Sequence, residues 1–241
     1  MAFNNNYFQT TQADYKARSI PATFISNVFS WMAIALAITA FTAWYFASNE
    51  NLIMSLISPT GGLTTLGWIV TFSPLGFVLF MSFGFQKLSA ATLALLFGVY
   101  SILMGMSLSF ILLIYTSASV FKTFAVTAGM FGIMAFVGYT TKTDLTKFGS
   151  LMFMGLIGII IASLVNLFLR SETFDYIISF IGVLVFTGLT AYDVQTLKRI
   201  GAGVEYGTES TKKLTIMGAL RLYLDFINLF LFLLRFLGSR R

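Results

Sequence analysis

Apolar residues dominate the chain in seven long stretches, separated by shorter stretches that contain most of its charges. A helix needs about 20 apolar residues to cross the hydrocarbon core of a bilayer, and each stretch is about that long. We therefore predict seven membrane-spanning helices whose short connections make successive helices antiparallel. The predicted spans are residues 24–47, 64–85, 90–115, 121–141, 149–169, 174–196 and 214–237.

The segments outside the spans are predicted to be tails and loops. Residues 1–23 are polar and lack the basic start, short apolar run and cleavage site of a signal peptide, so we expect a cytoplasmic tail. Pro and Gly predict a loop at 49–62. The longest late connection is predicted at 197–213, and residues 24–241 are expected to form a single transmembrane domain.

Two local signals bear on how the spans pack. Pro74 falls inside the second span, where a proline frees a backbone carbonyl and is expected to kink the helix. Small residues recur every four positions in the third span, at Ser101, Gly105 and Ser109. That spacing predicts a helix face on which a neighbour can approach closely.

Composition strengthens the membrane prediction and removes several kinds of chemistry. The 241 residues are 57% hydrophobic and 10% charged, whereas soluble domains carry roughly 25% charged residues. The fold class is therefore predicted to be all-α, a polytopic membrane protein in contact with lipid. The chain has no cysteine and no histidine, so any proton sensing must use carboxylates.

The net charge of +6 is interpreted as loop charge that sets membrane topology, not as a nucleic-acid interface, because no basic stripe is present. Seven spans place nine basic residues on the N-terminal side and four on the other, so the N-terminus is predicted to be cytoplasmic. The nine are Lys16, Arg18, Lys87, Lys142, Lys147, Lys198, Arg199, Lys212 and Lys213, and the four are Lys122, Arg170, Arg240 and Arg241. The last two would sit more comfortably inside, which would require a re-entrant last segment or a miscounted span.

Ionisable groups inside the last two spans are the candidate functional residues, because charges in lipid must face a partner or water. Asp193 lies near the end of the sixth span, and Arg221, Asp225 and Asn228 form a stripe at i, i+4 and i+7 on the seventh. Two carboxylates in contact in a low dielectric share one proton, which makes a pH switch without histidine. The alternative is that Asp225 only pairs with Arg221 on its own helix and that Asp193 is interfacial.

The predicted depths of the two aspartates differ. Asp193 is about 5 Å from its helix end at Leu197, and Asp225 is about 16 Å from Leu214. The depths match only if the seventh span starts later than drawn.

Two motifs carry a family resemblance. Tyr192-Asp193-Val194-Gln195 and, later, the stretch from Leu224 to Phe230 resemble the last two helices of the Bax inhibitor-1 family, and a bacterial member is expected. The resemblance implies a last helix wrapped by the other six and a pH-sensitive calcium leak with Asp193 and Asp225 as sensor. It also assigns Arg235, ten positions after Asp225, to the family pattern.

The chain departs from that pattern in its second span. Bacterial relatives carry there a basic residue that can latch the first aspartate and an acidic residue that can pair with the late arginine. Residues 64–85 contain neither. Lys87 could replace the basic latch by snorkelling, while no Asp or Glu is available for Arg235, so the direction of pH gating stays open.

Three functions remain open at this point. The first is a pH-sensitive calcium or cation leak gated by the carboxylate pair. The second is an intramembrane aspartyl protease, which is disfavoured because the Gly-x-Gly-Asp motif is absent. The third is a non-conducting regulator that binds a membrane protease or stress-response protein. We expect no enzyme activity, no cofactor and no metal site, and we expect a bacterial inner membrane location.

Overall fold

The computed structural model describes residues 5–58, 61–205 and 207–241, with side chains described from residue 21 onward. These residues contain eight helices, and all except α2 are long and apolar enough to cross a membrane. The prediction of an all-α protein with seven spans is therefore confirmed. The helices are α1 (Asn5–Ala47, of which Pro21–Ala47 is the candidate span), α2 (Glu50–Leu56), α3 (Thr65–Gly84), α4 (Ala90–Ile114), α5 (Ser117–Thr140), α6 (Thr146–Leu169), α7 (Glu172–Gly203) and α8 (Glu209–Leu237).

Most of the spans begin at a serine or threonine. In five of them this side chain accepts a hydrogen bond from the backbone N–H three residues later, which satisfies one of the unpaired donors at a helix start. The capping residues are Thr64 of α3, Ser89 of α4, Thr116 of α5, Ser171 of α7 and Thr208 of α8.

Two predicted loops are wrong in part. The segment 49–62 contains the short helix α2, which buries Leu56 completely, and the chain then reverses through Gly61 and Gly62, both with positive φ. The connection predicted at 197–213 shrinks to 204–208, because α7 and α8 both continue into it. Polar residues there are helical because they bind neighbouring segments, as described below.

The N-terminal tail is helical over most of its length, since α1 begins at Asn5. Residues 1–4 and Pro59 of the predicted loop lie outside the described residues. Pro74 does not interrupt α3, which is continuous from Thr65 to Gly84. The carbonyl that a proline frees four residues earlier belongs to Val70, and the Ser73 hydroxyl donates to it at 3.2 Å.

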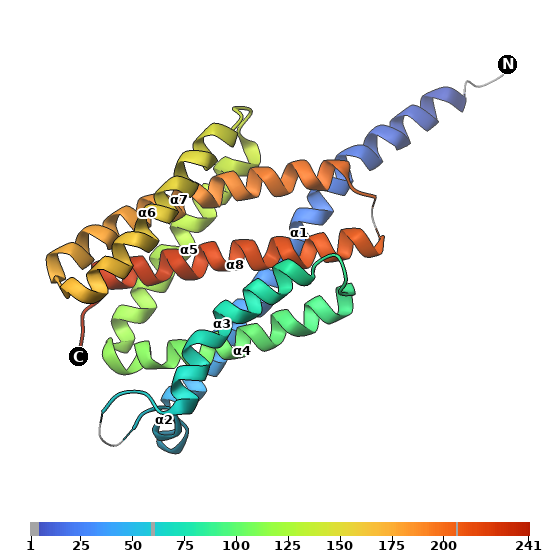
Figure 1. The fold of residues 1–241 in the computed structure, drawn as a ribbon. Helices are drawn as coiled ribbons and strands as arrows, with labels where there is room; N and C mark the ends of the chain where they lie inside the picture. The colour runs from blue at the N-terminus through green and yellow to red at the C-terminus, as the bar shows by residue number, and fades with distance from the viewer. Residues whose placement is uncertain (1–4, 59–60, 206) are drawn as a thin grey trace.

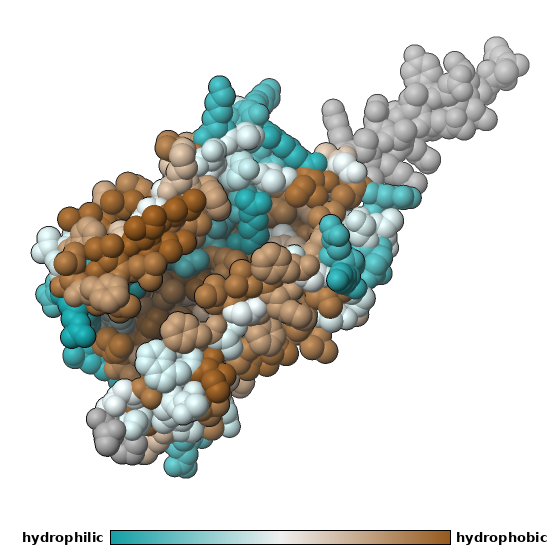
Figure 2. Space-filling model, viewed as in Figure 1, coloured by the Kyte–Doolittle hydropathy of each residue, from teal (hydrophilic) through white to brown (hydrophobic). Residues whose placement is uncertain are grey.

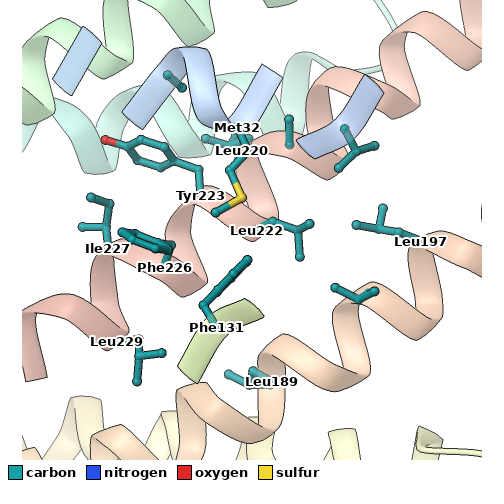
Figure 3. Close-up of a cluster of buried hydrophobic side chains, with 14 of the residues drawn as sticks. Met32, Phe131, Leu189, Leu197, Leu220, Leu222, Tyr223, Phe226, Ile227 and Leu229 are labelled. Atoms are coloured by element: carbon teal, nitrogen blue, oxygen red, sulfur yellow. The ribbon is translucent and has the colours of Figure 1, made fainter. Parts of the chain in front are cut away.

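Helix α8 lies in the middle of the bundle, as predicted (Figure 1). It packs mainly on α1, α4, α5 and α7, while α3 packs on α4 and α6 packs on α7. The family resemblance implied that six helices wrap the last one. In the structure four of them pack directly on α8, and α3 and α6 form an outer layer against α4 and α7. Figure 3 shows the apolar cluster around it, in which Leu222, Tyr223 and Leu229 are fully buried.

The outside of the bundle is apolar, in the manner of a protein solvated by lipid. Large hydrophobic side chains point outward from all seven spans, and Phe83 and Phe168 are each 84% exposed. Figure 2 shows these faces in brown, with hydrophilic side chains gathered at the helix ends and in a hollow between α7 and α8. Such a surface would aggregate in water.

The small residues of α4 form a close contact, as their spacing predicted. Ser101 and Ser109 are completely buried, and α1 and α4 pack on each other along their length. A Cβ on Gly105 would lie 2.6 Å from the backbone oxygen of Thr39, so only glycine allows the two helices to approach this closely.

Candidate functional site

The structure brings Asp193 of α7 and Asp225 of α8 together inside the bundle. They are 3% and 5% exposed, and each carboxyl group acts electrostatically on the other. Asp193 Oδ1 and Asp225 Oδ2 have no hydrogen-bond partner among the described residues. Because an ionised carboxylate only accepts hydrogen bonds, the two groups can bind each other only when one of them carries a proton.

Arg221 of α8 is the charged partner of this pair. Its Nε–H donates to Asp193 Oδ2 on the neighbouring helix, and its guanidinium lies 5.7 Å from the centre of the Tyr192 ring. Its charge also acts on Asp225. The ion pair therefore joins α7 to α8, and the alternative of a pair confined to α8 is wrong.

The Arg221 side chain is half exposed, whereas that of Asp193 is 4% exposed. One side of the ion pair thus faces outward and the other faces the buried carboxyl pair. A guanidinium at this depth needs water or other polar groups around it. The hydrophilic hollow between α7 and α8 in Figure 2 is in keeping with that requirement.

The length of α7 explains how the aspartates meet. Helix α7 continues to Gly203, so Asp193 lies about 15 Å from its helix end and not about 5 Å. The expected adjustment, a later start of the last span, is wrong, because α8 begins at Glu209, before the predicted residue 214. The error was therefore at the end of the sixth span.

Two of the predicted supporting residues have other partners. Asn228 donates from Nδ2 to the backbone oxygen of Leu224 at 2.8 Å, which turns its amide toward its own helix and not toward Asp225. Lys87 is exposed in the turn between α3 and α4. The described ion pair of Asp193 is with Arg221, so the structure does not bring Lys87 to it as a latch.

Arg235 has an acidic partner that the sequence reasoning missed. Its Nη1 lies 3.2 Å from Asp175 Oδ1, in the first turn of α7. Antiparallel neighbours place the start of one helix beside the end of the next, so this pairing could have been found from the span order. The two ion pairs, Asp193–Arg221 and Asp175–Arg235, join the same two helices at different depths.

A group of polar residues on α7 holds the loop between α5 and α6, and the sequence reasoning did not assign it. Gln195 accepts from the backbone N–H of Leu145 at 2.9 Å and donates to the Thr143 oxygen at 2.8 Å. Lys198 Nζ donates to the Tyr139 oxygen at 2.6 Å. Gln195 stands two positions after Asp193, in the motif that carried the resemblance, so this loop is tied directly to the turn that holds the carboxyl pair.

Asp144 completes the attachment of this loop and provides a control for pH effects. The Thr146 hydroxyl, the Arg199 guanidinium and the Thr146 backbone N–H all donate to this exposed carboxylate, and together they hold the pKa of Asp144 below its ordinary value. A lowered folded-state pKa gives a stabilisation that is complete above the unfolded value of about 3.9 and is lost as the pH falls through the folded pKa.

Asp144→Asn is therefore expected to leave any response between about pH 5 and 8 unchanged, because Asp144 stays ionised over that window. Its melting temperature, measured for the purified protein from about pH 2 to 8, should lie below that of the wild type by a constant amount above about pH 4, and the two should converge in acid, where the wild type loses the same stabilisation. A displaced midpoint in the window from pH 5 to 8 would show that this loop, and not the carboxyl pair, carries a pH response.

Known proteins resemble this chain over nearly its whole length. A sequence family described as inhibitor of apoptosis-promoting Bax1 matches residues 21–241. The inner membrane protein YbhL of Escherichia coli strain K12 is 50% identical over 220 residues, which cover 91% of this chain and 92% of the relative. Proteins of Borreliella burgdorferi and Rickettsia prowazekii are each 46% identical over 218 residues, which cover 90% of this chain and 92% and 90% of the relatives.

Proposed function

The chain belongs to the Bax inhibitor-1 family, and on that premise we propose that it is a pH-sensitive calcium leak gated by Asp193 and Asp225. The observation that carries the proposal is the buried carboxyl pair between α7 and α8, with Arg221 bound to one of its members. Ionisable groups at such a depth are retained for ion or proton pathways more often than for stability.

The Arg221–Asp193 ion pair is proposed as the latch of the closed state. Arg221 thereby takes the role of latching Asp193, which the family resemblance assigned to a basic residue of the second span. The pair is electrostatic, so it needs Asp193 ionised, and Asp225 can then hold the shared proton. The groups that act on the two carboxyls are each other and Arg221, so the balance of the site depends on these three charges.

This arrangement gives the pH effect a direction. Acid protonates the second carboxylate, removes the charge that Arg221 binds, and releases α7 from α8 at this point. The leak is therefore expected to rise as the pH falls.

The proposal also covers the membrane in which the protein lies and the side on which its N-terminus lies. A relative is named an inner membrane protein, and we propose the bacterial inner membrane for this chain, with the N-terminus cytoplasmic. Basic residues support that orientation, because seven with described positions lie at the end of the bundle where α1 enters. These seven are Lys87, Lys142, Lys147, Lys198, Arg199, Lys212 and Lys213.

The proposal is tested by calcium flux into liposomes that contain the purified protein, measured from about pH 5 to 8. We expect flux that increases toward acid pH in the wild type. Asp193→Asn removes the charge that Arg221 binds, so its flux at neutral pH should approach the acid value. Asp225→Asn leaves Asp193 to exchange a proton against Arg221 alone, so its flux should still rise toward acid pH, but with a displaced midpoint.

Asp144→Asn serves as the matched control, because it removes a carboxylate outside the pair and should keep the wild-type profile. Flux indistinguishable from empty liposomes at every pH would contradict the leak. Such a result, together with co-purification of a membrane protease, would favour the regulatory function instead.

A further inference from the structure

A groove of about 570 Å³ lies along the bundle between α1 and α5. Both helices pack on α8, but they do not pack closely on one another, and the end of α4 closes one side. The floor of the groove is α8 itself, through Phe226, Ile227 and Phe230. This volume falls within the range of about 300–1,000 Å³ that is typical of ligand sites.

The walls of the groove are apolar and differ in size. On α1 they include the small residues Ala40, Ala43 and Ala47 beside the larger Leu36 and Trp44, and on α5 they include the rings of Phe121 and Phe124. The stretch of small side chains facing the α5 rings leaves a long, narrow space. This is the shape that a hydrocarbon chain fills.

Nothing deep in the groove requires water. Thr39 lines the groove, but its hydroxyl already has two partners. It donates to the Ser101 backbone oxygen at 2.9 Å, and it accepts a hydrogen bond from the Tyr223 hydroxyl at 2.7 Å, because its own proton is used on Ser101. Apolar cavities of this kind stay dry, and a space of this volume left empty is destabilising. In a bilayer the surrounding material able to fill it is an acyl chain.

One end of the groove is polar and carries a positive charge. Ser48, Ser117 and Arg241 line it at the helix ends, where lipid head groups lie. The backbone of Arg241 is fixed there, because its N–H donates to the Ile114 oxygen at 2.9 Å. A guanidinium binds phosphate oxygens in pairs and matches a phosphodiester better than an ammonium group does.

We propose that this groove is a binding site for one phospholipid, with an acyl chain between α1 and α5 and the phosphate against Arg241. An apolar length that ends in a single cationic side chain complements a phospholipid, which is a hydrocarbon chain that ends in an anion. The acyl chain would contact Phe226, the residue after Asp225, so bound lipid would touch α8, the helix that carries Asp225. The site does not depend on calcium conduction.

The test uses the full-length protein in vesicles that contain a phospholipid with a photoreactive diazirine in its acyl chain. Crosslinked peptides are quantified by mass spectrometry, as the ratio of groove peptides to peptides from the outer faces of α3 and α6. Ala40→Trp fills the groove with an indole and should lower this ratio about tenfold. Ala37→Trp introduces the same side chain at an exposed position of α1 outside the groove, and should leave the ratio unchanged.

The phosphate contact has its own pair of variants. Arg241→Gln should reduce groove crosslinking, whereas Arg240→Gln, whose side chain lines a different cleft, should not. Equal ratios in Ala40→Trp and Ala37→Trp would overturn the site, and equal ratios in the two arginine variants would overturn the role of Arg241. If Ala40→Trp does not fold, Ser117→Trp at the mouth blocks the same groove and is judged in the same way.

Discussion

Replacing Arg221 with glutamine is expected to raise calcium flux at neutral pH about tenfold and to flatten its dependence on pH. The reason lies in the ion pair between Arg221 and Asp193, which joins α7 to α8 beside the carboxyl pair. Without the guanidinium, Asp193 has no counter-charge among its described partners, and the ion pair that joins α7 to α8 is absent at every pH. The protein should then behave at neutral pH as the wild type behaves in acid.

The size of the effect follows from the exposure of the pair. Breaking a fully buried ion pair costs about 3–5 kcal/mol, whereas exposed pairs contribute about 0–1 kcal/mol. Arg221 is half exposed and Asp193 is buried, so an intermediate value applies. Tenfold corresponds to about 1.4 kcal/mol and lies between these limits.

Two further variants separate the latch from other effects of charge. Arg199→Gln removes another arginine whose partner, Asp144, is on the surface, and should leave flux unchanged. Arg221→Lys keeps the positive charge but loses the Nε donor, and should keep part of the pH dependence. If Arg221→Gln conducts like the wild type at every pH, the closed state is held by another contact.

The seven spans could be predicted from the sequence because the bilayer imposes both their length and their composition. The end of α7 could not. Lys198 and Arg199, which follow the predicted end of the span at 196, look like the start of a loop when polarity alone is considered. In the structure they are helical, because the end of α5 and the loop after it supply their hydrogen-bond partners. Polarity shows that a residue needs a partner, but not whether the partner is water or protein.

The same distinction applies to the site. Asp193 and Asp225 stood out because lipid makes a lone carboxylate costly, and the structure places them together. The partner of Arg221 could not be read from spacing, because Asp225 at i+4 on the same helix was an equally good candidate. The choice depends on how α8 is rotated against α7, and that rotation is set by packing over the whole interface.

Among glycine-to-alanine substitutions in the membrane-spanning helices, Gly138→Ala is expected to destabilise the protein most. Gly138 of α5 lies against the backbone of Ala191 on α7, where an added Cβ would come far closer to the Ala191 oxygen than the 3.0 Å that real Cβ atoms keep. The obstacle is backbone, so it cannot rotate away as a side chain would. The two helices must separate, and overpacking of this kind costs about 3 kcal/mol or more.

The measurement is the melting temperature of the purified protein in detergent, with a loss on the order of 10 °C expected for Gly138→Ala. Gly132→Ala is the matched control, since Gly132 lies on the same helix with nothing within 4 Å of an added Cβ. It should be neutral or slightly stabilising, because alanine favours helix over glycine. Ala191 lies two residues before Asp193, so any folded Gly138→Ala protein should also have a displaced carboxyl pair and an altered pH profile. Equal melting temperatures for the two variants would show that α5 and α7 are not in backbone contact at this point, and that the carboxyl pair is positioned by other helices.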